Sequence, residues 1–307
     1  MDVTQKHMST RTWAELFLLS LIWGASFLSI RVALNEIGPF TAVAHRTIWA
    51  ALLLWGFAWV KAYKIPRNPL IWIGFFGMGI LNNFIPFTLM AWGQLYIETG
   101  LTSILNAGTA IFGIVVAAIF MADERLTFRK TIGVCCGFLG VATAVGLTAL
   151  LQFDIRSLAQ LSVIAGTISY ALAGVWARKT LSDVPPQVAA LGMLTCSSII
   201  ALPTAWMIEG PVSLDLQPMT WIAIGYYAVF ATACAYLLYF RILAAAGSGN
   251  VMVCTLLVAP VAILLGAVFL GETLPLNAYK GFLLLAFGLL LIDGRIVQAV
   301  QNRLRRT

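Results

Sequence analysis

The residues of this chain that could do chemistry are polar and aromatic side chains set inside long apolar runs. The richest segment reads Asn82-Asn83-Phe84-Ile85-Pro86-Phe87-Thr88. Pro86 has no backbone N–H, so it frees a carbonyl near position 82, which the two amides can cap. Polar groups are costly in such runs unless they are satisfied. Asn82 and Asn83 therefore indicate either a binding site near Pro86 or hydrogen bonds that hold helices together.

A second polar segment begins the next apolar run. Ser103 and Asn106 stand three residues apart and share one face of a helix. Their side chains can bond an amino or carboxyl group of a bound molecule. The alternative for Ser103 is a hydrogen bond to a backbone carbonyl of its own helix.

Aromatic side chains recur inside several runs, where rings can line a cavity and hold an apolar tail or a cation. The usual alternative for a membrane Trp is an anchor at the bilayer surface, and Trp13 and Trp221 suit it by position. We predict that a cavity is lined by Trp23, Ser26, Tyr170, Trp176, Tyr236 and Tyr239.

Three further residues are predicted to take part in gating: Arg31, Arg46 and Pro260. Arg46 is expected one to two turns deep, where an unpaired charge is costly. It can pair with Glu36, Glu98 or helix-end carbonyls in an outer gate, or it can bind a substrate carboxylate directly.

The elements that must position these side chains are membrane-length helices. Hydrophobic residues make up 61% of the 307 residues and charged ones 10%. A helix needs about 20 apolar residues to cross a bilayer. The sequence predicts an all-α membrane protein with ten such runs, near 13–34, 40–60, 70–92, 99–121, 130–148, 161–180, 187–208, 219–241, 249–270 and 277–294. Polar residues make the sixth run the weakest.

The distribution of basic residues predicts the orientation. With the N-terminus in the cytoplasm, fifteen of the 19 Lys and Arg residues fall on cytoplasmic segments, and three fall at outer ends or loops. Both termini are therefore expected in the cytoplasm, with a basic tail at 295–307. The net charge of +7 follows this topology and does not indicate a nucleic-acid partner.

The chain repeats itself. Trp23-Gly24-Ala25-Ser26 and the following residues to Val32 have a fainter copy 147 positions later, from Tyr170 to Lys179. Gly133, Gly140 and Gly146 recur at Gly281, Gly288 and Gly294. Five runs separate the copies, so the second half enters the membrane from the opposite side. The sequence predicts two inverted five-helix repeats, 13–148 and 161–294, an arrangement typical of transporters.

These motifs resemble the drug/metabolite transporter superfamily, in its EamA-type branch. Trp23-Gly24-Ala25-Ser26-Phe27 is similar to the family's W-G-x-x-F opening. Glu124-Arg125-Leu126 and Gly271-Glu272-Thr273-Leu274 resemble its G-E-x-L endings, and Ala259-Pro260 its helix-breaking proline. Arg46 resembles an Arg common near the start of the second span. The fourth span departs from the pattern, because Asn106-Ala107-Gly108-Thr109 stands where a proline is usual, and Gly108 can supply part of the lost flexibility.

The resemblance implies ten helices around a central cavity in the bacterial inner membrane, and the chain is most similar to amino-acid and metabolite exporters. We therefore expect export of small amphipathic metabolites, most plausibly neutral or aromatic amino acids, by a monomer surrounded by lipid. No cofactor is expected. No P-loop, HExxH or GxSxG motif appears, and no acidic residue lies in mid-membrane. The rivals are an integral-membrane enzyme, which would need a cluster of His, Asp or Glu, and a non-transporting receptor or assembly subunit.

Overall fold

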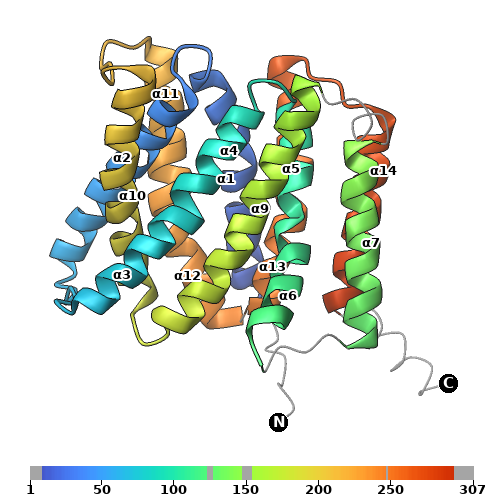
Figure 1. Ribbon diagram of the computed structural model, residues 1–307, viewed down its shortest axis with the longest axis horizontal. Helices are drawn as coiled ribbons and strands as arrows, with labels where there is room; N and C mark the ends of the chain where they lie inside the picture. Colours follow the sequence, from blue (N-terminus) through green and yellow to red (C-terminus); the bar gives the residue numbers. More distant parts are fainter. Residues whose placement is uncertain (1–8, 123–126, 147–153, 247, 294–307) are drawn as a thin grey trace.

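The protein is a bundle of helices. The computed structural model describes residues 9–122, 127–146, 154–246 and 248–293, and every regular element within these ranges is helical (Figure 1). The elements are α1 (Thr10–Ala33), α2 (Pro39–Val60), α3 (Pro69–Met78), η1 (Gly79–Phe84), α4 (Ile85–Gly93), α5 (Thr99–Ala107), α6 (Thr109–Phe120), α7 (Phe128–Val145), α9 (Ile155–Thr180), α10 (Pro186–Glu209), α11 (Pro218–Gly225), η2 (Tyr226–Cys234), α12 (Ala235–Ala246), α13 (Ser248–Leu270) and α14 (Leu276–Asp293).

Eight helical segments are long and apolar enough to cross a membrane, so this is a multi-pass membrane protein. They are Thr10–Ala33, Pro39–Val60, Pro69–Gly93, Thr99–Phe120, Phe128–Val145, Ile155–Thr180, Pro186–Glu209 and Pro218–Ile242. Two shorter apolar helices follow, Leu257–Leu270 and Leu276–Ile292. The sixth predicted run is one of the eight despite its polar residues. The basic tail 295–307 and the Glu124-Arg125-Leu126 motif lie outside the described residues.

Proline sets the start of several helices. Pro39, Pro69, Pro186 and Pro218 each stand in a first turn. There the missing N–H would have no partner in the helix, and the fixed φ suits helical backbone. These prolines also mark equivalent starting points, from which positions in different spans can be compared.

Glycine lets α7 and α14 approach backbone to backbone. A Cβ atom added at Gly140 would lie 2.5 Å from the backbone nitrogen of Leu285, and one at Gly281 would lie 2.4 Å from that of Ala144. Such contacts suit lipid, where close packing replaces the hydrophobic effect between helices. Of the recurring glycines, Gly133, Gly140, Gly281 and Gly288 therefore have a packing role at this helix pair.

Two spans are interrupted by π-helical turns. The segment η1 joins α3 to α4, and η2 joins α11 to α12. A π-helix bonds each N–H to the carbonyl five residues earlier and is frequent at functional sites. Pro86 thus leaves the carbonyl of Leu81 without a backbone donor, and the Oγ of Ser169 on α9 donates to it at 2.7 Å. The freed carbonyl lies next to the predicted position 82, but Ser169 caps it in place of the neighbouring amides.

The fourth span also breaks, at Gly108 between α5 and α6. The N–H of Gly108 bonds to the carbonyl of Leu105, three residues back, at 3.0 Å. This tighter turn ends α5 without a proline. The interruption falls at the residue that the sequence marks as a source of flexibility.

Candidate functional site

A hydrogen-bonded polar cluster lies where η1 and α12 meet. The Nδ2 of Asn82 donates to the hydroxyl of Tyr236 at 3.1 Å, and that hydroxyl donates to the Oδ1 of Asn83 at 3.2 Å. Asn82 Nδ2 also lies 3.4 Å from Asn83 Oδ1 and 3.7 Å from the sulfur of Met193 on α10. The two predicted amides and one predicted tyrosine are therefore brought together from distant parts of the chain.

Arg46 lies in the same part of the bundle, against η2 and α4. Its Nε donates to the Oγ1 of Thr232 on η2 at 2.9 Å, and its guanidinium carbon lies 3.8 Å from the centre of the Phe87 ring. Thr232 in turn donates to the carbonyl of Tyr227 at 2.8 Å, inside the π-helical segment. Arg46 thereby joins α2 to η2 and α4. Three tyrosines lie close enough to the guanidinium to interact with it electrostatically: Tyr170, Tyr227 and Tyr236.

The expected ion pairs of Arg46 with Glu36 or Glu98 are absent. Glu36 accepts from the backbone N–H of Gln217 at 3.1 Å, and Glu98 pairs with Arg156 at 2.6 Å. Both carboxylates are held at helix ends, too far along the bundle to reach a residue two turns into α2. Among the described residues, no carboxylate forms an ion pair with Arg46.

The side chains of this region combine deep placement with partial exposure. Arg46, Asn82, Tyr170 and Tyr236 are each partly exposed, although protein atoms enclose them densely. Their partial exposure distinguishes them from the fully buried side chains of the core. Asn83, by contrast, is 0% exposed, and its Nδ2 has no hydrogen-bond partner in the described protein. The hydroxyl of Tyr227 is likewise buried and unpartnered.

An aromatic chain runs from this region to α1. The ring centre of Trp23 lies 5.8 Å from that of Tyr239, Tyr239 lies 5.3 Å from Phe240, and Phe240 lies 6.2 Å from Tyr236. The indole N–H of Trp23 donates to the carbonyl of Ala231 on η2 at 3.2 Å. Trp23 therefore contacts other helices inside the bundle and is not an anchor at the bilayer surface.

Tyr170 also belongs to the central group. It packs edge-on against Phe87 at 6.5 Å. Pro86 is buried one turn beyond Asn82, and a Cβ atom added at Gly166 of α9 would lie 3.4 Å from its Cα. Gly166 thus lets α9 pack closely at the helix break.

Other predicted residues lie apart from the cluster. The indole of Trp176 donates to the carbonyl of Gly74 at 3.0 Å, on α3. Ser26 donates to the carbonyl of Trp23, as a helix-satisfying serine would. Pro260 is exposed on α13, and Arg31 donates to the carbonyl of Gln94 at the end of α4. No contact in the described part of the chain joins these four residues to Arg46 or Asn82.

Ser103 and Asn106 form a separate polar group on α5. The Oγ of Ser103 and the Oδ1 of Asn106 are buried and have no partner in the described protein. Helix α5 packs against α9 and α13. The predicted shared face is therefore present, but no hydrogen bond links it to the amides of η1.

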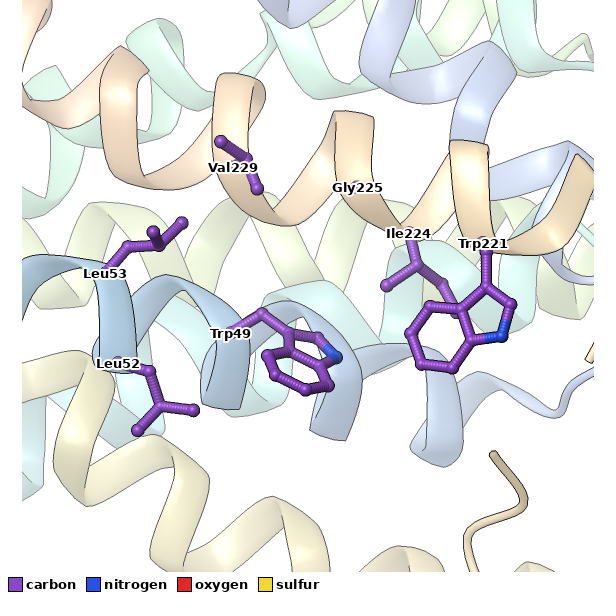
Figure 2. A pocket seen from close by; sticks show the side chains of 7 residues that line it. All are labelled: Trp49, Leu52, Leu53, Trp221, Ile224, Gly225 and Val229. Carbon is purple, nitrogen blue, oxygen red and sulfur yellow. The ribbon is translucent and has the colours of Figure 1, made fainter. Parts of the chain in front are cut away.

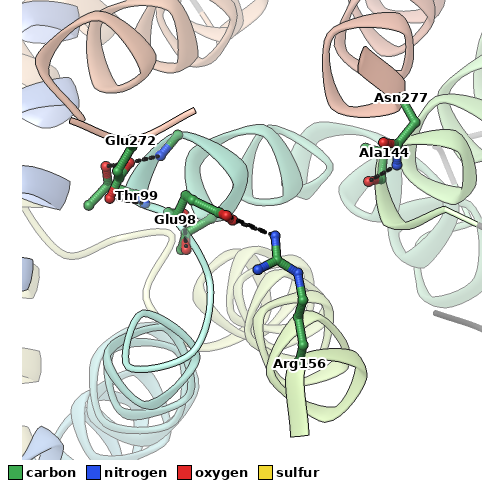
Figure 3. A network of polar contacts seen from close by, with 8 residues as sticks. Glu98, Thr99, Ala144, Arg156, Glu272 and Asn277 are labelled. Carbon is green, nitrogen blue, oxygen red and sulfur yellow. Dashed lines mark hydrogen bonds and ion pairs between the residues drawn. The ribbon is translucent and has the colours of Figure 1, made fainter. Parts of the chain in front are cut away.

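Carboxylates tie the two halves of the chain together at one end of the bundle, which we call the latch end. Glu209 of α10 accepts from the backbone N–H of Thr41 at 2.8 Å, and Glu272 accepts from that of Thr99 at 3.0 Å. Glu36 caps the start of α11 in the same way. Figure 3 shows Glu272 with Thr99, and Glu98 reaching Arg156. A carboxylate at a helix N-terminus satisfies free N–H groups and matches the helix dipole.

Two hollows stand out among the described residues, and neither coincides with the polar cluster. One is an apolar groove of about 430 Å³ between α2 and α11–η2, lined by Trp49, Leu52, Trp221 and neighbours (Figure 2). The other, of about 480 Å³ at the latch end, is bordered by Asp154, Arg156 and Gln160. Hydrogen bonds from the backbone and then the side chain of Ser157 hold the pKa of Asp154 below its ordinary value. The polar cluster remains the candidate site because it combines the unpartnered amide of Asn83 with Tyr236, which also interacts electrostatically with Arg46.

Sequence reasoning missed four residues of this region: Phe87, Met193, Tyr227 and Thr232. Phe87 and Met193 look like ordinary apolar residues of a span. Thr232 carried a usable signal, because it follows Pro218 by the same number of residues as Asn83 follows Pro69. Comparing the halves from their first-turn prolines would have marked it.

Comparisons with known proteins agree with this architecture. An uncharacterized transporter of Archaeoglobus fulgidus is 24% identical over 288 residues, covering 92% of this chain and 98% of that protein. The uncharacterized transporter YvbV of Bacillus subtilis is 26% identical and covers 92% of each chain. The uncharacterized inner membrane transporter YedA of Escherichia coli is 23% identical, covering 91% of this chain and 90% of its own.

The fold itself has a solved counterpart. A crystal structure superposes with a TM-score of 0.66 at 16% identity, covering 92% of this chain and 96% of the other. The sequence profile of the EamA-like transporter family matches residues 12–146 and again residues 157–293. The two matches together span most of the chain, and the chain belongs to the EamA-like transporter family.

Proposed function

We propose that this protein exports small amphipathic metabolites, most plausibly neutral or aromatic amino acids, across a bacterial inner membrane. The observation that supports this most directly is the deep polar cluster of Asn82, Asn83 and Tyr236 beside Arg46, at the meeting point of both halves of the chain. A carrier needs polar groups at bilayer depth that a substrate can reach. Partly exposed amide, hydroxyl and guanidinium groups supply them.

The proposed mechanism is alternating access between two inverted five-helix repeats. Helix α1 packs on α13 as α9 packs on α6, and each of the pairs α2–α10 and α7–α14 joins two corresponding spans of the repeats. These pairings are what an exchange of the two repeats would produce. With the predicted orientation, the latch end faces outward, where Glu36, Glu209 and Glu272 each join one repeat to the other. This state is closed to the outside, and export requires these contacts to separate.

Flux through purified protein tests the proposal. Proteoliposomes that contain the full chain should release preloaded labelled phenylalanine, leucine or another neutral amino acid without ATP, and faster than empty liposomes. Cells that overproduce the protein should tolerate toxic amino-acid analogues better than control cells. Flux equal to that of empty liposomes for every compound tested would refute the assigned substrate class.

A further inference from the structure

Arg46 carries a positive charge two turns into helix α2. A guanidinium stays protonated in proteins, and an unpaired charge deep in a membrane protein is expensive. Here the described residues offer one hydrogen bond, from Nε to Thr232, and one ring face, from Phe87. The ring quadrupole attracts a cation placed over its face. These contacts reduce the cost of burying the charge but do not neutralise it.

The rest of the guanidinium is left unused. The Nη1 and Nη2 groups of Arg46, which together carry four N–H donors, bond to no described residue. A purely structural link between α2 and η2 would need a single donor toward Thr232. The Nδ2 of Asn83 and the hydroxyl of Tyr227 are also buried without partners in the described protein. No acidic side chain in the described part of the chain forms a hydrogen bond or ion pair with the free Nη groups of Arg46.

We propose that Arg46 receives the carboxylate of the transported substrate, so that the substrate is a compound with one carboxylate group and an apolar body. A guanidinium fork matches a carboxylate in a two-point hydrogen bond. Arg46 is a single cation and therefore matches a ligand with a single negative charge. Arg31 and Arg241 add no charge here, because they bind elsewhere, to the carbonyl of Gln94 and to Glu15. This inference rests on the proposed transport function and names the chemistry at its site.

The remaining contacts orient the substrate. The Oδ1 of Asn82 accepts no hydrogen bond from the described protein, while its Nδ2 is held by Tyr236. That oxygen is available to an amino group one or two bonds from the carboxylate. The aromatic chain of Tyr236, Phe240, Tyr239 and Trp23 leads away from this point. The carboxylate then lies against α2 and η2, and the apolar body lies along the rings.

Binding of matched acid and amide pairs tests the proposal. Phenylacetate and phenylacetamide have nearly the same shape, but only the acid is charged. Equilibrium dialysis of the purified full chain should show the acid bound at least about tenfold more tightly, as a charge-assisted hydrogen bond is expected to give. Arg46→Gln should remove this difference by weakening the acid and leaving the amide unchanged. Arg129→Gln, which removes a guanidinium from α7 far from the cluster, should leave the difference intact.

Several results would overturn the assignment. These are equal binding of acid and amide to the unmutated protein, no binding of phenylacetate, acetate or phenylalanine, or a loss in Arg46→Gln that is equal for acid and amide. Should Arg46→Gln fail to fold, Arg46→Lys decides, because it keeps the charge, loses the fork and should lower only the acid's affinity. Flux is measured in parallel. Flux that ignores the acid group refutes the carboxylate site alone, whereas selective binding without any flux refutes the proposed transport alone.

Discussion

Two corners of the bundle each contain a π-helical turn, but the side chains around the two turns differ. At one corner η1 faces α10, where Asn82 lies beside Met193. At the other η2 faces α2, where Thr232 binds Arg46. Arg46 follows Pro39 by the same number of residues as Met193 follows Pro186, and Asn83 and Thr232 are matched in the same way. A repeated π-helical turn thus fixes the position of the proposed site, while single differences between the repeats make it charged on one side only.

The physical reason lies in what each turn leaves free. A π-helical turn breaks the regular bonding of its span and exposes polar groups inside the bundle. In η1 the break is tied to Pro86, and Ser169 satisfies the freed carbonyl. In η2 there is no proline, and Thr232 bonds back to Tyr227 within the turn. Both turns are thus stabilised, but only η2 holds a cation.

The largest effect is expected from Asn82→Leu, which removes the polar side chain of the η1 corner. Transport in proteoliposomes should fall about tenfold or more. The melting temperature in detergent should stay close to that of the unmutated protein, because a Leu side chain is favourable in apolar surroundings. Phe230→Leu, on the exposed face of η2, is the matched control and should keep full flux.

A purely structural role of Asn82 predicts a different result for Asn82→Leu. If the amide only holds helices together, flux will persist and stability will drop, by about 0.6 kcal/mol for a typical hydrogen bond within a membrane protein. Measuring both quantities on the same preparation separates binding from packing.

A smaller effect is expected from Thr232→Val at the η2 corner. The change keeps the shape of the side chain but removes the acceptor for Arg46 and the donor to Tyr227. Phenylacetate affinity should fall several-fold because the guanidinium loses its orientation, and phenylacetamide affinity should not change. Thr232→Ser should restore the acid's affinity. An equal loss for both ligands, or no rescue by Ser, would mean that Thr232 only stabilises the π-helical turn.

The smallest effect is expected from Met193→Leu, at the position that corresponds to Arg46. Volume-conserving exchanges of this kind cost less than about 1.5 kcal/mol, and the contact of Asn82 with the sulfur is a weak one at 3.7 Å. Flux and acid-over-amide preference should stay within about twofold of the unmutated values. A loss as large as that of Thr232→Val would show that both corners hold the substrate alike and would remove the proposed asymmetry.

Much of this arrangement could be anticipated along the chain. Long apolar runs locate the spans, since only a helix satisfies its own backbone in lipid. Asn82 and Asn83 were predicted because polar side chains stand out there, and Tyr236 because aromatic rings were expected to line a cavity. Gly108 was marked at the break of its span, and the recurring glycines indicated close helix contact.

Other features could not be anticipated in this way. The partner of Arg46 was expected to be an acidic residue or a helix-end carbonyl, because a buried charge is usually paired. Thr232 and Phe87 lie far from Arg46 in sequence, and no local pattern connects them. Trp176 and Ser26 resemble site residues by type and repeat position, yet Trp176 bonds to α3 and Ser26 to its own helix.

The sequence by itself determined that the chain crosses a membrane repeatedly and which polar residues enter the spans, because hydropathy and the cost of buried polar groups act locally. Only the tertiary structure decided which of these residues meet. A side chain's partner depends on helix rotation and register, and the π-helical turns of η1 and η2 alter both within a span. The unpaired guanidinium between Phe87 and Thr232 is therefore a property of how the helices pack, although Arg46 itself is plain to see in the sequence.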